Sequence, residues 1–181
     1  MSNIKIRPAN MNDAPLIAQV VSMVIGEDSA TKLCGIGYPG VLEEAAAAEG
    51  TQYSYLNALV AEVDGVAAGA ALGYDGANLH QLREGTLAVI RNSYPTPSIP
   101  DDETAAGEFY IDSIGILPQY RNHGAGKKLL MAMVGKGLAL GNDRVGLMVD
   151  FENSGAAALY ERCGFKPVGE KLFYSHKMHH L

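Results

Sequence analysis

The first third of the chain changes from a strand-like to a helix-like pattern of apolar residues. Residues 4–10 (IKIRPAN) alternate apolar and charged side chains up to a proline, which predicts a short edge strand. Residues 12–27 (NDAPLIAQVVSMVIGE) repeat apolar residues at helical spacing, and Asn12 or Asp13 is placed to cap that helix. An alanine-rich stretch at residues 40–50 (GVLEEAAAAEG) predicts a second helix that ends at a glycine.

The middle of the chain holds a hairpin signal and then a stretch of different character. Asp64 and Gly65 separate two apolar runs, which is typical of a tight β-hairpin. Residues 79–92 (LHQLREGTLAVIRN) fit a helix, whereas residues 93–107 hold three prolines and three consecutive acidic residues and are expected to form a loop. We expect the region at about 76–106 to be an insertion on one face of the domain.

The second half of the chain alternates strands and helices. The pattern predicts, in order, a strand at 107–118, a helix at 127–140, a strand at 144–151, a helix at 153–165 and a strand or hairpin at 166–178. Asn153 or Ser154 is placed to cap the second of these helices, and Gly164 to end it. The complete order, β-α-α-β-β-β-α-β-α-β, predicts a mixed α/β fold with a single domain over residues 1–181.

The composition is that of an ordinary globular protein with an acidic surface. Among 181 residues, 48% are apolar and 19% are charged, and the net charge is −6 with a pI of about 5.3. This balance argues against non-specific nucleic-acid binding, which requires a basic surface. An acidic surface suits a cationic acceptor, although solubility alone also explains it.

Cysteine usage and hydropathy indicate a reducing, aqueous compartment. Cys34 and Cys163 form neither a CxxC pair nor a disulfide framework, so we expect reduced thiols in a cytoplasmic protein. The N-terminal stretch MSNIKIRPAN lacks the apolar core of a signal peptide, and no apolar run reaches the ~18 residues of a membrane span. We therefore expect neither a leader nor a membrane partner.

A glycine-containing loop separates the predicted central strand from the helix that follows. A Walker A loop is excluded because Arg121 stands where its first glycine belongs and Lys128 where its Ser or Thr belongs. A dinucleotide fingerprint, G-x-G-x-x-G, fails at Leu129. An R-x-x-G-x-G pattern remains (Arg121, Gly124, Gly126), in which backbone N–H groups and the helix dipole favour an anion. On these residues alone, a phosphate site and a plain tight turn both stay open.

Two motifs together resemble the acyl-CoA site of the GNAT superfamily of N-acetyltransferases. In the first, residues 111–130 (IDSIGILPQYRNHGAGKKLL), an apolar strand ends before a proline and a Q/R-x-x-G-x-G/A loop opens a helix. The second repeats the superfamily's L-x-V, Asn, A-x-x-L-Y and G-F spacing with Leu147, Val149, Asn153, Ala156, Leu159, Tyr160, Gly164 and Phe165. The resemblance covers residues 107–170, and the region 76–106 lies outside the family pattern.

The resemblance implies a fold and an activity. The fold is the GNAT acyl-CoA N-acyltransferase fold, an α+β arrangement whose central sheet is mostly antiparallel and flanked by helices. The activity is direct transfer of an acetyl group from acetyl-CoA to an amine, either of a small molecule or of a protein, with acetyl-CoA as cosubstrate and no metal. The alternative is a non-catalytic acyl-CoA-binding regulator of the same fold. Many members dimerise, so a homodimer stays open.

The resemblance also implies where the donor binds. The pantetheine arm is expected to pair with backbone around Ile114 and Ile116. Asn153 is expected to hydrogen-bond that arm, although a plain helix cap explains it equally well. Tyr160 is the expected general acid for the leaving thiolate. The pyrophosphate is expected on the amides of Arg121, Asn122, His123, Gly124, Ala125, Gly126 and Lys127, with the Arg121 side chain as a further contact.

The general base is less narrowly defined by the sequence. Strict alternation places Glu108, Tyr110 and Asp112 on one face of the central strand, alongside Ile114 and Ile116. Asp112 is favoured because it lies nearer the expected thioester, and Glu108 and ordered water are the alternatives.

The acceptor site is expected between the helical region 25–55 and the C-terminal region 168–178, with the region 76–106 as a further contributor. These segments offer acidic and aromatic side chains that suit a cation: Glu27, Asp28, Tyr38, Tyr53 and Tyr55.

Overall fold

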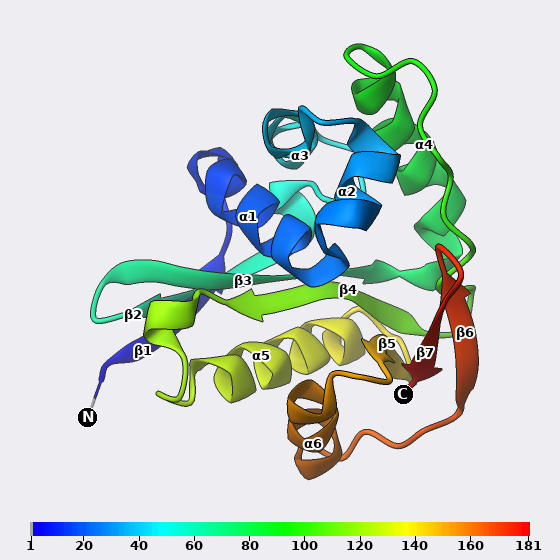
Figure 1. Cartoon of the computed structure of the whole chain (residues 1–181). Helices are drawn as coiled ribbons and strands as arrows, with labels where there is room; N and C mark the ends of the chain where they lie inside the picture. The colour runs from blue at the N-terminus through cyan, green and yellow to red at the C-terminus, as the bar shows by residue number, and fades with distance from the viewer. Residues whose placement is uncertain (1) are drawn as a thin grey trace.

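A seven-stranded sheet in the order β1-β2-β3-β4-β5-β7-β6 organises the computed structural model, which describes residues 2–181 (Figure 1). The strands are β1 (Ile4–Pro8), β2 (Ala58–Val63), β3 (Val66–Asp75), β4 (Phe109–Ile116), β5 (Val145–Asp150), β6 (Gly169–Phe173) and β7 (His176–His180). Neighbouring strands are antiparallel except β4 and β5, which are parallel. The expected mixed α/β arrangement with a mostly antiparallel sheet is therefore present.

Helices cover both faces of the sheet. The helices are α1 (Ala14–Ile25), α2 (Glu27–Cys34), α3 (Tyr38–Ala47), α4 (Leu79–Arg91), α5 (Ala125–Ala139) and α6 (Ser154–Arg162). In Figure 1, α1, α2 and α3 lie on one face, and α5 and α6 lie on the other. Short 3₁₀ turns occur at Met11–Asp13, Tyr55–Asn57, Gly76–Asn78 and Pro118–Tyr120. No helix within residues 2–181 is long and apolar enough to span a membrane.

Two apolar clusters hold these layers together. On the first face, Ile17 of α1 and Leu42 of α3 are fully buried against Leu72 of β3. On the second face, Leu129 and Met133 of α5 pack with other fully buried residues that include Phe109, Ile111 and Leu147. Because both faces are sealed, the sheet edges and strand ends are the places where a ligand can reach the backbone.

Several predictions from the pattern are confirmed. The strand at the N-terminus is an edge strand, and Asp64 and Gly65 form the β2–β3 turn with φ values of 52° and 84°. The side chain of Asn153 caps α6 by accepting a hydrogen bond from the Ala156 N–H (3.1 Å). The helix predicted at residues 79–92 is α4.

The predicted cap of the first helix is confirmed only in position: Asp13 is the N-cap residue of α1, but its side chain makes no capping hydrogen bond to that helix. The side chain of Asn10 caps the preceding 3₁₀ turn by accepting a hydrogen bond from the Asn12 N–H (2.9 Å). Asp13 closes the reciprocal capping box by accepting from the Asn10 N–H (2.8 Å). Its carboxylate also receives two hydrogen bonds from Arg7, at 2.7 and 2.9 Å, and these lower the pKa of Asp13. The Asp13 carboxylate therefore binds Arg7 of the edge strand and the Asn10 backbone, and it does not cap α1.

The sequence pattern missed α2. Its sequence, EDSATKLC, is polar in the first turn and too short to show clear apolar periodicity. Gly26 and Gly35, with φ values of 80° and 74°, separate it from its neighbouring helices. Tertiary packing stabilises α2 instead, since Leu33 and Cys34 are buried in the first cluster.

A β-bulge in β4 overturns the expected alternation on that strand. Ser113 pairs with Leu72 and Ile111 pairs with the next residue of β3, so Asp112 has no partner of its own. The extra residue shifts the alternation by one. Ile114 and Ile116 consequently pack on the α5 side with Phe109 and Ile111, whereas Tyr110 packs on the other side with Tyr74 and Leu79.

Residues 92–107, which we call the connecting segment, link α4 to β4 and are tied to three other elements. The Ser98 N–H donates to the carbonyl of Lys32 in α2 (3.0 Å), and the Tyr174 hydroxyl of the β6–β7 turn donates to the carbonyl of Ser98 (2.6 Å). Lys171 of β6 donates to the carbonyl of Glu103 (2.8 Å). That the region 76–106 is an insertion into one domain stays a prediction.

Two glycines of α5 give opposite predictions for stability. A Cβ on Gly137 meets the buried Phe109 ring at 2.7 Å, whereas a Cβ on Gly135 has no atom within 4 Å. Gly135→Ala should stabilise the protein by about 1 kcal/mol through helix propensity. Gly137→Ala should destabilise it by about 1–3 kcal/mol through overpacking. Urea denaturation of both variants checks this, and equal stabilisation by the two would contradict the packing described for Phe109.

Candidate active site

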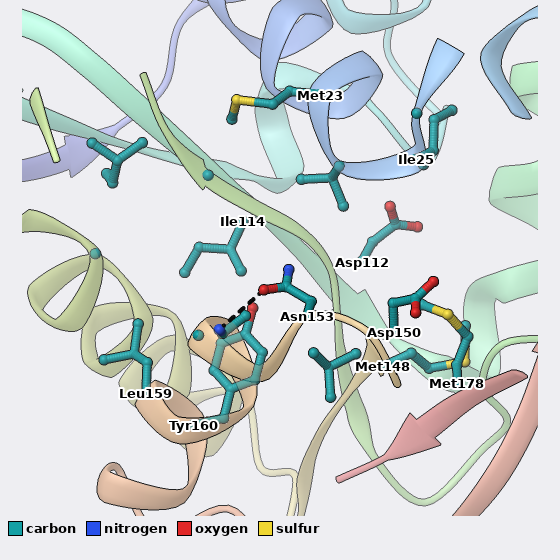
Figure 2. A pocket seen from close by; sticks show the side chains of 18 of the residues that line it. Met23, Ile25, Asp112, Ile114, Met148, Asp150, Asn153, Leu159, Tyr160 and Met178 are labelled. Carbon is teal, nitrogen blue, oxygen red and sulfur yellow. Dashed lines mark hydrogen bonds between the residues drawn. The ribbon is translucent and has the colours of Figure 1, made fainter. Parts of the chain in front are cut away.

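The main cavity lies where β4 and β5 separate. The two strands pair only at Phe109–Val145, Tyr110–Gly146 and Ile111–Leu147, after which β5 pairs with β7 instead. The separation leaves one edge of β4 without a strand beside it from Asp112 onward. A cavity of about 1120 Å³ occupies this region, bounded by β4, β5, the start of α5, α6, the α1–α2 junction and the C-terminal hairpin (Figure 2).

The N-terminus of α5 forms one end of the cavity. The first helical hydrogen bond runs from the Lys128 N–H to the Gly124 carbonyl (3.2 Å), so three preceding N–H groups have no partner inside the helix. These belong to Ala125, Gly126 and Lys127, and all three residues line the cavity. The first turn carries no acidic residue to balance the helix dipole. Unpaired donors, the dipole and Lys127 together favour an anion at this position.

Positions 124 and 126 of the loop are glycine for different physical reasons. Gly124 has a φ of 83°, which a residue with a side chain adopts only at a cost. Gly126 has no such requirement, and an added Cβ would lie 3.7 Å from Ile116 and 3.9 Å from Leu159. The protein alone therefore has room for a side chain at 126. A bare backbone at that position matters for what the cavity holds rather than for folding.

The other loop residues divide into those on the cavity wall and one outside it. Arg121 and Asn122 line the cavity, and His123 does not. The guanidinium of Arg121 donates from Nε to the carbonyl of Ile116 (3.0 Å), which ties the loop to the end of β4. The ring Nδ1 of His123 lies 3.5 Å from the hydroxyl of Ser2 at the surface.

Asn153 and Tyr160 stand together on the α6 wall of the cavity (Figure 2). The Asn153 carbonyl oxygen is used by its helix cap, so its amide NH₂ is the group left to donate to a ligand. Tyr160 is 8% exposed, and burial raises the pKa of its phenol to about 12. The phenol is therefore fully protonated at neutral pH and acts there as a hydrogen-bond donor.

Asp112, the bulged residue of β4, is held at the cavity wall by a chain of hydrogen bonds. Its carboxylate accepts from the Tyr74 hydroxyl (2.7 Å) and from the Ser113 hydroxyl (3.0 Å), and Gln52 donates to the same Tyr74 oxygen (3.0 Å). Burial raises the pKa of Asp112 above its usual value although both hydroxyls oppose this. A fixed carboxylate with a raised pKa is a stronger proton acceptor than a carboxylate in water.

Glu108, the alternative base, does not line the cavity. It precedes β4 and lies over Gly146, where β4 and β5 are still paired. Its carboxylate accepts from the Thr104 hydroxyl (2.6 Å) and contacts His180 Nε2 (3.0 Å). Burial acts to raise the pKa of Glu108, but the hydrogen bonds from His180 and Thr104 outweigh it and leave the pKa lowered. The carboxylate is thus satisfied within the protein.

The end of the cavity away from α5 matches the expected acceptor region in part. Glu27, Asp28 and Tyr53 line it, whereas Tyr38 and Tyr55 do not. Tyr55 instead donates from its hydroxyl to Glu49 (3.3 Å).

Sequence reasoning missed Glu103. It lines the cavity and is 5% exposed, although its run of acidic residues has the composition of a surface loop. The sequence carries no local signal that distinguishes it from Asp101 and Asp102, because its burial depends on the anchors of the connecting segment.

Potential metal ligands do not gather in the described structure. Within residues 2–181, no group of three or more His, Cys, Asp or Glu side chains is placed to hold a metal ion. Of the C-terminal histidines, His179 stacks on Phe151 with ring centroids 3.7 Å apart, and His180 contacts Glu108.

Comparison with known proteins identifies relatives that carry out acetyl transfer. A stretch of 76 residues is 41% identical to the mycothiol acetyltransferase of Beutenbergia cavernae, and it covers 42% of this chain and 24% of that protein. The chain thus spans about a quarter of the length of the curated relatives it matches.

Solved structures and a family profile extend the likeness to the whole fold. A structure described as an acetyltransferase is 30% identical with a TM-score of 0.81, over 97% of this chain and 96% of that chain. An N-acetyltransferase from Staphylococcus aureus Mu50 is 28% identical with a TM-score of 0.84, over 98% of each chain. These matches confirm the resemblance and the fold class read from the sequence. The profile of the acetyltransferase (GNAT) family matches residues 37–165, from α3 through both acyl-CoA motifs, and the chain therefore belongs to that family.

Proposed function

We propose that this protein transfers the acetyl group of acetyl-CoA directly to an amine. The observation that carries the proposal is a single cavity that contains an anion site, an unpaired strand edge, a buried phenol and a carboxylate with a raised pKa. A binding protein has no evident use for the last two groups, whereas acetyl transfer needs both.

The donor is proposed to lie along the gap between β4 and β5. Its pyrophosphate accepts from the N–H groups of residues 125–127 at the start of α5, with Lys127 adding positive charge. Its pantetheine amides extend along the free edge of β4 between Ser113 and Ile116, as an added strand does. Asn153 contributes its NH₂ group to the same arm.

The chemistry requires one bond to form and one to break. The amine nitrogen forms a C–N bond to the acetyl carbonyl carbon, and the C–S bond of the thioester breaks. An alkyl ammonium has a pKa of about 10.4, so roughly one molecule in a thousand is free base at neutral pH. We assign Asp112 to accept the ammonium proton, directly or through water, because Tyr74 and Ser113 hold its carboxylate in place.

The leaving sulfur is assigned to Tyr160. A thiol has a pKa of about 8.5, well below that of this buried phenol, so Tyr160 donates a hydrogen bond as negative charge develops on sulfur. The nitrogen loses its second proton to solvent once the C–N bond has formed, the thiolate takes one proton from solvent, and the proton held by Asp112 returns to solvent. The sum is one amide, one CoA thiol and one released proton for each ammonium consumed.

Substitution of Gly126 should lower the affinity for CoA without lowering the stability of the protein. Gly126→Asp places a carboxylate at the start of α5, where it favours the helix dipole but repels pyrophosphate. We expect unchanged or slightly raised thermal stability and a CoA affinity lowered by at least about tenfold, or about 1.4 kcal/mol. Calorimetric titration with CoA measures this, with Gly126→Ala as the uncharged control. Equal affinities for the Asp variant and the wild type would remove the pyrophosphate from this site.

Tyr160→Phe should lower kcat by about 100-fold with little change in the KM for acetyl-CoA, because the lost hydrogen bond forms only as sulfur gains charge. A phenol whose pKa is about 12 stays protonated throughout the usual assay range. The kcat of the wild type should rise with pH because more of the amine is free base. It should show no falling limb below pH ~10 because the phenol keeps its proton. An unchanged kcat in the variant, or a falling limb below that pH that the variant lacks, would contradict the assignment.

Release of CoA thiol in the presence of amines distinguishes the enzyme from a regulator. We expect thiol to appear in proportion to amide when the protein is given acetyl-CoA and a mixed panel of small amines. Tight CoA binding without thiol release for any amine or peptide in the panel would favour the non-catalytic alternative. The Asp112→Asn variant supplies the matched control, since it keeps the CoA site and should lower the rate.

A further inference from the structure

Charged residues on the cavity wall are segregated along its length. The cations that line it come from the α5 loop and α6: Arg121, Lys127 and Arg162. The carboxylates come from α2, the connecting segment, β4 and β5: Glu27, Asp28, Glu103, Asp112 and Asp150. On the described wall, the α5 end is therefore basic, as a pyrophosphate requires, and the opposite end is acidic.

Glu103 is the most unusual of these carboxylates. It is 5% exposed, and its Oε2 atom is buried without a hydrogen-bond partner. Of the two cations near it, Lys171 donates to its backbone carbonyl, and Arg83 donates to the Asp102 carboxylate (2.6 Å) and the Asp101 carbonyl (3.1 Å). A buried carboxylate without a bonded cation is costly, and Oε2 is itself shielded from the cavity, so a cationic ligand that lowers this cost must approach the other carboxylate oxygen, Oε1.

A second carboxylate adds to this need for a cation. Burial raises the pKa of Glu103, and the negative charge of Asp112 raises it further. The positive charges of Arg83 and Lys171 lower it, but not enough to offset these two effects. Asp112 also lines the cavity, and burial raises its pKa as well. Two carboxylates that face one space in this way are best stabilised by positive charge placed between or beside them.

The connecting segment is anchored beside the acidic end, which holds Glu103 in position. The connecting segment is bonded through Ser98 to α2 and to the β6–β7 turn, and through Glu103 to β6. Figure 1 shows this segment running from α4 down beside the C-terminal hairpin. Tyr53 and Tyr110, both at most 5% exposed, line the same end and offer ring surface to methylene groups.

From these features we propose that the acceptor is a small diamine or polyamine, in which Glu103 binds the non-reacting ammonium while the reacting amine lies at Asp112. This inference rests on the proposed acetyl transfer and names its substrate class. Glu103 is then a specificity-determining residue supplied by the connecting segment, which lies outside the motifs that bind the donor. A carboxylate on the acceptor would meet like charge at this end, so amino acids are disfavoured.

Four probes test the charge requirement: 1,4-diaminobutane, butylamine and 4-aminobutanoate, which share a four-carbon chain, and the longer spermidine. We expect kcat/KM for both polyamines to exceed that for butylamine by at least about tenfold, the effect of one charge-assisted hydrogen bond, and 4-aminobutanoate to be the poorest. Glu103→Gln should remove this preference by lowering kcat/KM for the polyamines about tenfold while leaving butylamine within about twofold. CoA affinity should not change.

Asp101→Asn is the matched control, since it removes the same charge two residues away from an exposed side chain and should change none of these ratios. Butylamine used as well as diaminobutane would overturn the inference while leaving acetyl transfer intact. An equal loss for all four amines in Glu103→Gln would also overturn it, because a purely structural role through Arg83 predicts that result.

Direct binding separates the inference from the activity. Calorimetric titration of spermidine into the protein–CoA complex should show binding that Glu103→Gln weakens and Asp101→Asn preserves. Absence of spermidine binding to the wild-type complex would overturn the inference whatever the turnover. Binding with no thiol release for any amine would instead sink the proposed acetyl transfer, and with it the placement of a reacting amine at Asp112.

Discussion

The separation of β4 from β5 after three residue pairs is the constraint on which the rest of the site depends. Parallel strands that part in mid-sheet leave backbone donors and acceptors without partners, and such groups are tolerated only where water or a ligand reaches them. The bulge at Asp112 falls at the point of separation and turns β4 away from its neighbour. A cavity follows from this geometry, since no side chain of either apolar cluster fills the gap.

The same bulge links backbone geometry to chemistry. The bulge leaves Asp112 on the side of Tyr74, where the Gln52–Tyr74–Asp112 hydrogen bonds fix it. The shifted alternation beyond it brings Ile114 and Ile116 to the α5 side. The nearest apolar residues on either side, Ile111 and Ile114, both pack in the cluster under α5. One inserted residue thus lets a single strand contribute to the packed core, to the unpaired edge beside β5 and to the carboxylates on the cavity wall.

Sequence reasoning predicted the geometry of the α5 loop and the α6 cap better than that of the opposite cavity wall. Gly124 and the Asn153 cap follow from local backbone requirements, and local requirements leave fixed spacings in the sequence. The bulge in β4, the burial of Glu103 and the position of Glu108 outside the cavity leave no local pattern in the sequence. Each is decided by a distant partner: the register of β3, the anchors on α2 and β6, and His180 of β7. Alternation alone therefore placed Ile114 and Ile116 on the wrong face of β4.

Hydrogen–deuterium exchange with and without CoA tests the central claim, that the gap between β4 and β5 receives the donor. We expect CoA to slow exchange by at least about tenfold in peptides that cover residues 113–127, where unpaired strand and helix N–H groups gain acceptors. Peptides from the sealed strand β2 should exchange at the same rate in both states. Unchanged exchange over 113–127, or equal slowing throughout the chain, would contradict this account.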